Sequence, residues 1–216
     1  MPEKVLALVS GGPDSATMAY SAKNNGADLS LLHLYQGKPH SDKELECARK
    51  LALALDSRLD VIDVSSIVQI MGSVLTIHSE AAVLPYGTGI VLSIASAYAL
   101  KIKASKVYLA IHADDTAEGP EFSDEFLNAM SRTVHTSGAS ADLTIEAPLL
   151  TMHKPDIIRM GQTLDVPFED TWSCIGVESH HCGLCGACHA RQRAFQLAGI
   201  PDPTVYVHQS SSSSAG

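Results

Sequence analysis

Short apolar runs alternate along the chain with longer segments in which apolar residues recur every three or four positions. The runs have the length of buried strands, and the longer segments are typical of helices with one apolar face. The stretch 67–78 is weaker, part helix and part loop, and no regular element is expected after residue 164. In chain order the pattern predicts strand 5–9, helix 13–24, strand 29–35, a helix capped by Ser41 or Asp42 and running to about 55, strand 58–64, helix 90–100, strand 107–111, helix 122–135, strand 143–147 and helix 155–164.

Strands and helices alternate at least four times, which favours an α/β fold: an open, mostly parallel sheet with helices on both faces. Ligands of such sheets bind at the carboxyl ends of the strands. Polar segments 10–12, 35–40 and 112–115 all follow predicted strands, so we expect an enzyme. The expected division is an α/β domain over 1–165, a C-terminal segment over 166–208 and a disordered polar tail over 209–216.

Composition narrows the function classes. The 216 residues are 45% hydrophobic with a net charge of −9, which indicates a globular protein and disfavours nucleic acid or an anionic membrane as partner. No apolar run reaches the roughly 18 residues of a membrane span, and the N-terminus does not resemble a signal peptide. We therefore expect a cytoplasmic protein, in which cysteines are metal ligands or core thiols rather than disulfides.

A glycine-rich turn stands between the first strand and the first helix. Glycines let the backbone approach a ligand, and the N-terminus of the helix adds N–H donors and partial positive charge. The turn is not a Walker A loop, because its Gly-Lys-Ser/Thr end is missing. The simpler alternative is an ordinary turn capped by Ser and Asp. The sequence of this predicted phosphate loop is Ser10-Gly11-Gly12-Pro13-Asp14-Ser15.

Four of the five cysteines, Cys174, Cys182, Cys185 and Cys188, lie within fifteen residues. Four thiolates make a closed tetrahedral site for Zn²⁺, which is structural because no position stays open for a substrate. An iron–sulfur cluster is the alternative, since two-residue gaps occur there too. Nearby histidines can substitute for a thiolate or support the ligands; they are His180, His181 and His189.

The phosphate loop resembles the SGGxDS loop of the N-type ATP pyrophosphatases, the PP-loop superfamily. Together with the cysteine array it resembles the QueC family of 7-cyano-7-deazaguanine synthases. Segment 171–206, segment 147–158 with Lys154, and segment 35–48 with Glu44 or Glu46 resemble further motifs of that family. The resemblance spans nearly the whole chain outside the tail.

The resemblance implies an ATP-dependent ligase, with structural Zn²⁺ and with Mg²⁺ accompanying ATP. It implies that 7-carboxy-7-deazaguanine and ammonia give a nitrile through an acyl adenylate and an amide, in a homodimer. The implied catalytic residues are Asp14, Ser15 and Lys154. The implied ATP-binding residues are Ser10, Gly11, Gly12, Asp14, Ser15, Tyr35, His40 and Asp114.

Two segments depart from the family pattern. Residues 84–89 lack the Arg and Asn of a Pro-x-Arg-Asn motif, and residues 119–123 keep only Pro120 of a Tyr-Pro-Asp-Cys-Arg motif, with Glu121 in the place of Asp. Alternatives are therefore an adenylating enzyme that acts on another carboxylate or stops at the amide, and a zinc module that binds nucleic acid. Asp114 and Asp115 are candidates for Mg²⁺ or the substrate edge, or are turn residues, and Lys154 is alternatively a solvated residue at a helix start.

Overall fold

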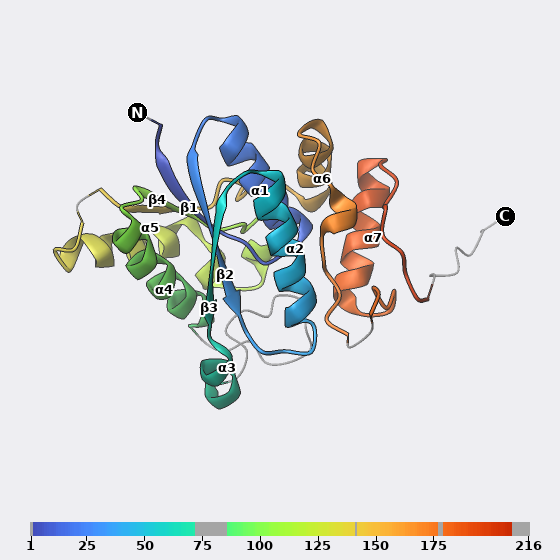
Figure 1. Cartoon of the computed structure of the whole chain (residues 1–216), viewed down its shortest axis with the longest axis horizontal. Helices are drawn as coiled ribbons and strands as arrows, with labels where there is room; N and C mark the ends of the chain where they lie inside the picture. Colours follow the sequence, from blue (N-terminus) through green and yellow to red (C-terminus); the bar gives the residue numbers. More distant parts are fainter. Residues whose placement is uncertain (1, 72–85, 141, 177–178, 209–216) are drawn as a thin grey trace.

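A five-stranded parallel sheet forms the centre of the computed structural model, which describes residues 2–71, 86–140, 142–176 and 179–208 (Figure 1). The strand order is β3-β2-β1-β4-β5, and every neighbouring pair is parallel, as expected. Residue Val5 of the central strand pairs with Leu29 on one side and with Lys106 on the other. The strands are β1 (Lys4–Leu8), β2 (Asp28–Tyr35), β3 (Arg58–Asp63), β4 (Lys106–Tyr108) and β5 (Thr144–Glu146).

Helices cover both faces of the sheet. Val5 and Ala7 of β1 pack into one apolar core, with Met18, whereas Leu6 and Leu8 pack into another, with Leu92. Alternate residues of a strand point to opposite faces, so this division confirms the predicted sandwich of helices around the sheet. The helices of this part are α1 (Pro13–Asn24), α2 (Ser41–Ala54), α3 (Ser65–Met71), α4 (Gly87–Ile102), α5 (Asp124–Thr136) and α6 (Lys154–Thr163), with single 3₁₀ turns η1 (Asp115–Ala117), η2 (Pro120–Phe122) and η3 (Phe168–Asp170).

Most element boundaries lie within three residues of the expected ones, but two expectations were wrong. The residue that caps α2 is His40, and Ser41 is already helical. Strand β4 has three residues, not the five expected for 107–111. Residues 72–78 and the tail 209–216 lie outside the described residues.

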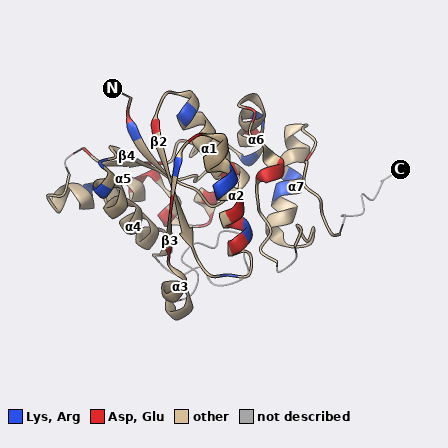
Figure 2. Cartoon of the chain, in the orientation of Figure 1, with Lys and Arg blue, Asp and Glu red and all other residues tan. Residues whose placement is uncertain are grey.

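Helix α4 is almost entirely tan in Figure 2, because Lys101 near its end is the only charged residue in this helix. This composition fits its position against the sheet. Among the described residues, no helix combines the length and the apolar character that crossing a bilayer requires.

Helix α7 (Gly186–Ala198) is the largest difference from the sequence-based prediction, which had no helix after residue 164. Cys185 caps its start, and Gly199, which has a φ of +73°, caps its end. Phe195 of α7 packs edge-on against Phe168, with ring centroids 5.1 Å apart. The glycines and cysteines at its start resemble a loop, which hid the helix-forming residues that follow.

Candidate active site

The phosphate loop lies between the carboxyl end of β1 and the start of α1, as predicted. Gly11 has a φ of +86°, and a Cβ there would collide with the main-chain oxygen of Glu44 in α2. A side chain at Gly11 is therefore excluded twice, by conformation and by space. The helix begins at Pro13 directly after the extended Gly12, so its first N–H groups face the loop.

Two serines hold the loop in shape. The Ser10 N–H donates to Ser15 Oγ at 3.2 Å, and the Ser15 hydroxyl donates to the Gly12 oxygen at 3.1 Å. The Gly12 N–H in turn donates to Ser10 Oγ at 3.2 Å. Ser15 is buried, with 3% of its surface exposed. Its hydroxyl therefore shapes the loop from inside, and the N–H groups at the start of α1 are the donors available to an anion.

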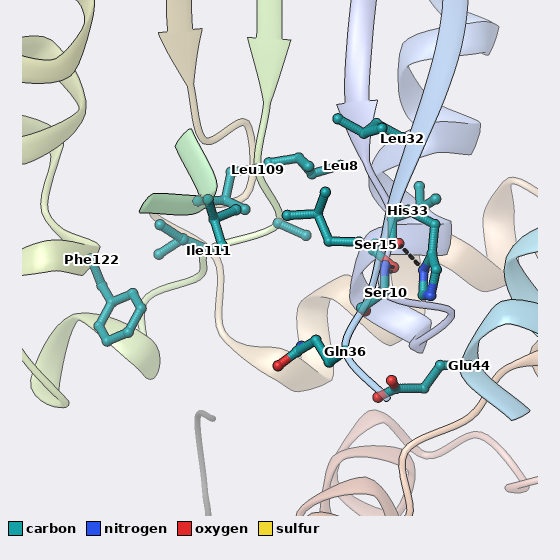
Figure 3. Close-up of a pocket in the computed structure, with 14 residues that line it drawn as sticks. Leu8, Ser10, Ser15, Leu32, His33, Gln36, Glu44, Leu109, Ile111 and Phe122 are labelled. Carbon is teal, nitrogen blue, oxygen red and sulfur yellow. Dashed lines mark hydrogen bonds between the residues drawn. The ribbon is translucent and has the colours of Figure 1, made fainter. Parts of the chain in front are cut away.

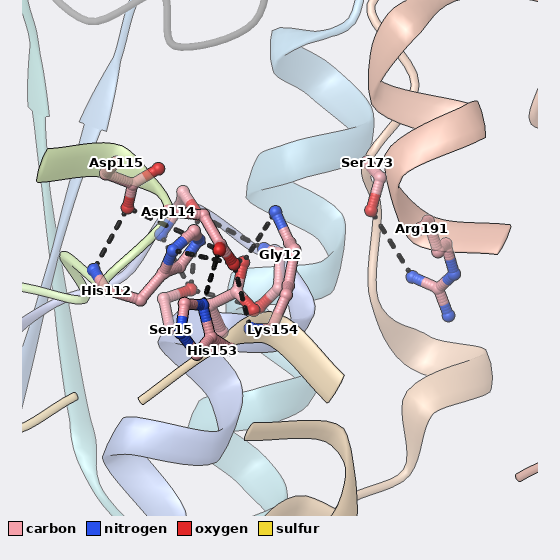
Figure 4. A network of polar contacts seen from close by, with 11 residues as sticks. Gly12, Ser15, His112, Asp114, Asp115, His153, Lys154, Ser173 and Arg191 are labelled. Carbon is pink, nitrogen blue, oxygen red and sulfur yellow. Dashed lines mark hydrogen bonds and ion pairs between the residues drawn. The ribbon is translucent and has the colours of Figure 1, made fainter. Parts of the chain in front are cut away.

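A cluster of charged side chains lies against the loop (Figure 4). Lys154 Nζ, from the first residue of α6, is 3.3 Å from Asp14 Oδ2. His112 Nε2, after β4, is 3.3 Å from Asp115 Oδ2 and 3.8 Å from Asp14 Oδ2. Lys154 is thus not the solvated helix-start lysine of the alternative interpretation: only 18% of its side chain is exposed, and it points at the loop.

Burial and neighbouring charges shift the pKa values of the side chains in this cluster. Burial lowers the pKa of Lys154, but Asp14 and Asp115 outweigh it and raise that pKa, so Lys154 stays a cation. Burial raises the pKa of Asp115 to about 7 against the opposing effects of the His112 N–H and Lys154. A fixed cation beside a helix N-terminus is a site for a polyphosphate. Asp14 Oδ1 is buried and has no hydrogen-bond partner among the described residues, which fits a Mg²⁺ ion accompanying that anion.

Asp114, which lies after β4, forms hydrogen bonds with the residues at the start of α6. Its Oδ1 accepts a hydrogen bond from His153 Nδ1 at 2.7 Å, and its Oδ2 accepts one from the Lys154 N–H at 3.0 Å. Burial raises the pKa of Asp114, but these hydrogen bonds outweigh it and lower that pKa. Asp114 thus anchors the start of α6 and positions Lys154, a task that engages both its oxygens.

A cavity of about 250 Å³ opens beside the loop at the carboxyl ends of β1, β2 and β4 (Figure 3). Its polar residues gather at one end, and an apolar slot forms the other. The polar residues are Ser10, Ser15, His33, Gln36 and Glu44. The apolar residues are Leu8, Val9, Leu32, Leu34, Val91, Leu109, Ala110, Ile111 and Phe122. Such a cavity, mostly apolar with a few polar groups, is typical of a small-molecule site.

Three of these polar residues were not predicted as binding residues. His33 Nδ1 donates to the Val9 oxygen at 2.8 Å, which leaves Nε2 as a buried acceptor without a partner among the described residues. Gln36 Oε1 is likewise buried without a partner there. Burial raises the pKa of Glu44 to about 7, against Lys38. For Gln36 and Glu44 the available signal was the resemblance of segment 35–48 to a family motif, and for His33 it was a histidine inside an apolar strand, which is weak without the fold.

The predicted residues Tyr35 and His40 lie beside the cavity rather than in its lining. The Tyr35 hydroxyl donates to Asp42 Oδ1 at 2.9 Å. His40 Nε2 lies 3.7 Å from Glu44 Oε1, and burial lowers the pKa of His40. Both residues therefore support the segment that carries Gln36 and Glu44.

The two segments that differ from the family pattern, residues 84–89 and 119–123, are joined by hydrogen bonds. The Glu121 carboxylate accepts hydrogen bonds from the Tyr86 N–H and, at 2.8 Å, from the Thr88 N–H at the start of α4. Phe122 lines the cavity, and Ser123 caps α5. Residues 84 and 85 lie outside the described residues. Glu121 thus stabilises the N-terminus of α4, where a carboxylate is favourable.

The four cysteines converge as predicted. The sulfurs of Cys174, Cys182, Cys185 and Cys188 all lie within 4.8 Å of one another, and two of the pairs are 3.9 Å apart. Around one tetrahedral ion with bonds of about 2.3 Å, sulfurs are about 3.8 Å apart. The spacing therefore fits a single ion, whereas a four-iron cluster holds its cysteine sulfurs farther apart.

Hydrogen bonds to the sulfurs favour the thiolate form that a metal requires. Cys174 Sγ accepts from the Gly176 and Cys182 N–H groups, and Cys182 Sγ from the Leu184 and Cys185 N–H groups. At Cys182 burial raises the pKa, but the hydrogen bonds outweigh it and lower that pKa to about 7. At Cys174 burial outweighs the two N–H groups, and the pKa is raised. None of the three nearby histidines, His180, His181 and His189, belongs to this group of ligands. His181 is buried against Trp172 and accepts a hydrogen bond from the Ser173 N–H, so it supports the segment, whereas His180 and His189 are exposed.

A parallel sheet of order 3-2-1-4-5 that carries the Ser-Gly-Gly-Pro-Asp-Ser loop after its first strand places the chain in the PP-loop class of α/β proteins. Solved structures share this fold. NMN synthetase from Francisella tularensis matches with a TM-score of 0.57 and 17% identity, over 93% of this chain and 79% of that one. NH₃-dependent NAD synthetase from Campylobacter jejuni matches with a TM-score of 0.55 and 18% identity, over 77% of this chain and 66% of that one.

Sequence comparison identifies the family within this class. The model of "Queuosine biosynthesis protein QueC" matches residues 4–199. The 7-cyano-7-deazaguanine synthase of Methanospirillum hungatei is 33% identical, over 94% of this chain and 99% of the relative, and that of Archaeoglobus fulgidus is 35% identical, over 94% and 90%. The chain belongs to the QueC family.

Proposed function

We propose that this protein is an ATP-dependent 7-cyano-7-deazaguanine synthase. The observation that carries the proposal is the phosphate loop, which lines a mostly apolar cavity through Ser10 and Ser15 and has Lys154 held 3.3 Å from its Asp14, in a chain of the QueC family. The alternatives, another carboxylate acceptor or a zinc module for nucleic acid, find no support in the named relatives.

The proposed reaction uses ATP twice. A carboxylate oxygen of 7-carboxy-7-deazaguanine attacks the α-phosphorus, the bond to pyrophosphate breaks, and an acyl adenylate forms. Ammonia attacks the acyl carbon, AMP leaves with one oxygen, and a proton is lost to give the amide. The amide oxygen then attacks a second ATP, pyrophosphate leaves again, and loss of AMP and of the N–H protons gives the nitrile. Both oxygens of the acid thus leave on AMP, and water is not released.

The chain's residues have separate tasks in this proposal. The N–H groups at the start of α1 and the Lys154 cation bind the pyrophosphate as its charge grows, which lowers the barrier to its departure. Asp14, with its unpartnered Oδ1, is the residue we assign to Mg²⁺, which shields phosphate charge when bound. Asp114 and Ser15 keep Lys154 and the loop in place, and the cavity takes the nucleoside.

We assign Zn²⁺ to the four cysteines, because their spacing fits one ion and no position remains open for chemistry. The ion would stabilise the segment that carries α7. The ammonia donor, the homodimer, the cytoplasmic compartment and the division at residue 165 stay predictions of the sequence.

The test is incubation of the purified protein with 7-carboxy-7-deazaguanine, ammonium and MgATP, with products followed by liquid chromatography and mass spectrometry. We expect the nitrile, with two AMP and two pyrophosphate for each nitrile by the balance above. ADP as the product, or adenylation of the acid without amide or nitrile, would contradict the proposal. Asp14→Ala is the inactive control, since it keeps the loop backbone.

A further inference from the structure

The main chain before the first metal-binding cysteine lies directly against the phosphate loop. The Trp172 N–H donates to the Gly11 oxygen at 2.8 Å. The Trp172 oxygen would be 3.5 Å from a Cβ placed on Gly12. The loop is thus held on one side by α2, where Gly11 meets Glu44, and on the other by Trp172.

Arg191 of α7 holds this same segment on both sides of Trp172. Its Nη2 donates to the Phe168 oxygen at 2.8 Å, and its Nη1 donates to Thr171 Oγ1 at 2.8 Å and to Ser173 Oγ at 3.4 Å. Figure 4 shows the Arg191 side chain pointing from α7 toward Ser173. Only 1% of Arg191 is exposed, so its donors have been taken from water and depend on these partners.

A carboxylate balances the buried guanidinium. Arg191 Nε is 3.2 Å from Asp202 Oδ1, and Asp202 Oδ2 accepts from the Tyr206 hydroxyl. Burial raises the pKa of Asp202, but Arg191 and these hydrogen bonds outweigh it and lower that pKa. The planar guanidinium group of Arg191, a fork of five N–H donors, can bind all these fixed acceptors at once. A lysine, with a single ammonium group, cannot.

The Trp172 side chain joins the same network from the other direction. Its indole Nε1 donates to the Cys174 oxygen at 2.6 Å, and its ring lies 4.3 Å from the His181 ring, between centroids. The cysteine segment and the phosphate loop therefore meet at Trp172, and Arg191 holds the residues on both sides of it.

We propose that Arg191 is a positioning residue for the phosphate loop, acting through the main chain at Trp172. When the Arg191 guanidinium group holds the residues on both sides of Trp172, the Trp172 N–H keeps its hydrogen bond to the Gly11 oxygen. The loop then stays open for a polyphosphate. This role rests on the proposed use of ATP at the loop, and it extends that function to a residue that touches neither the loop nor the cavity in the contacts described here.

The experiment measures MgATP binding by calorimetry in the full chain, beside metal content and thermal unfolding. Arg191→Lys keeps the charge but loses the fork, and we expect the dissociation constant of MgATP to rise by about tenfold. Arg193→Lys, an exposed position on the same helix, is the matched control and should stay within about twofold. Trp172 is the single tryptophan of the chain, so its fluorescence reports whether nucleotide reaches the adjoining loop.

A second pair of variants decides the case if Arg191→Lys does not fold. Thr171→Val removes one acceptor of Arg191 and should weaken MgATP binding by about fivefold, whereas Thr171→Ser keeps the hydroxyl and should bind like the wild type. A second measurement is carboxylate-dependent exchange of pyrophosphate into ATP. In this assay the KM of Thr171→Val for ATP should rise with little change in kcat. A purely structural role would lower the melting temperature and leave the affinity for MgATP unchanged.

Two outcomes separate the two proposals. If the wild type binds MgATP and metal-loaded Arg191→Lys and Thr171→Val bind it equally well, the positioning role is wrong and the proposed function stands. If the wild type binds neither MgATP nor inorganic pyrophosphate, both fall together.

Discussion

The ionisation of Glu44 leads to a prediction about the stability of the fold that does not depend on the proposed reaction. Its carboxyl lies in the cavity with 23% of the side chain exposed, 3.7 Å from His40. Burial raises the pKa of Glu44 from 4.5 to about 7, and Lys38 opposes the shift. Burial also lowers the pKa of His40, so His40 supplies no cation at neutral pH. Glu44→Gln replaces a group that ionises with a neutral one of nearly the same shape.

The sign of the effect follows from the raised pKa. The folded protein holds the Glu44 proton more tightly than the unfolded chain does, so this contribution to stability is complete below pH 4.5 and is lost as the pH rises through about 7. Each pKa unit corresponds to about 1.4 kcal/mol. Between pH 5 and pH 8 the wild type should therefore lose about 2.5 kcal/mol relative to Glu44→Gln. For a chain of this length that is a melting-temperature difference of about 5 to 10 °C.

The assay is urea or thermal unfolding of both proteins across pH 5 to 8, read as the difference between them. Asp115, whose pKa burial also raises to about 7, is present in both and drops out of the difference. Glu46→Gln on the same helix is the control, because Glu46 is exposed and pairs with Lys43 and Lys50, and its difference should stay within about 0.5 kcal/mol at every pH. A flat difference for Glu44→Gln would refute the argument that burial sets its ionisation.

Three further outcomes are expected. Asp14→Asn should lower carboxylate-dependent pyrophosphate exchange by about a hundredfold or more at unchanged circular dichroism, and full exchange would place the reacting phosphates elsewhere. Lys154→Met should raise the KM for ATP by at least about tenfold, and an unchanged KM would return Lys154 to a structural role. Cys185→Ser should reduce bound metal in elemental analysis and weaken hydrogen-exchange protection of α7, whereas Cys47→Ser, outside the cysteine cluster, should do neither.

Residues close together in the sequence account for what could be predicted. The alternation of strands and helices determined the α/β class, and residues 10–15 determined the phosphate loop, because a tight turn with adjacent N–H donors is a local property. The spacing of the four cysteines determined the metal site in the same way. These features require few contacts with distant parts of the chain.

The partners of the charged residues were decided only by the tertiary structure. Asp114 could be a turn residue or a ligand by sequence, and the fold gives both its oxygens to the start of α6, forty residues away. The sequence assigned Arg191 no role, and burial among acceptors from residues 168–202 made it the centre of a network. A polar side chain takes its ionisation and its task from the groups that fold around it, and those groups come from distant segments that local pattern does not pair.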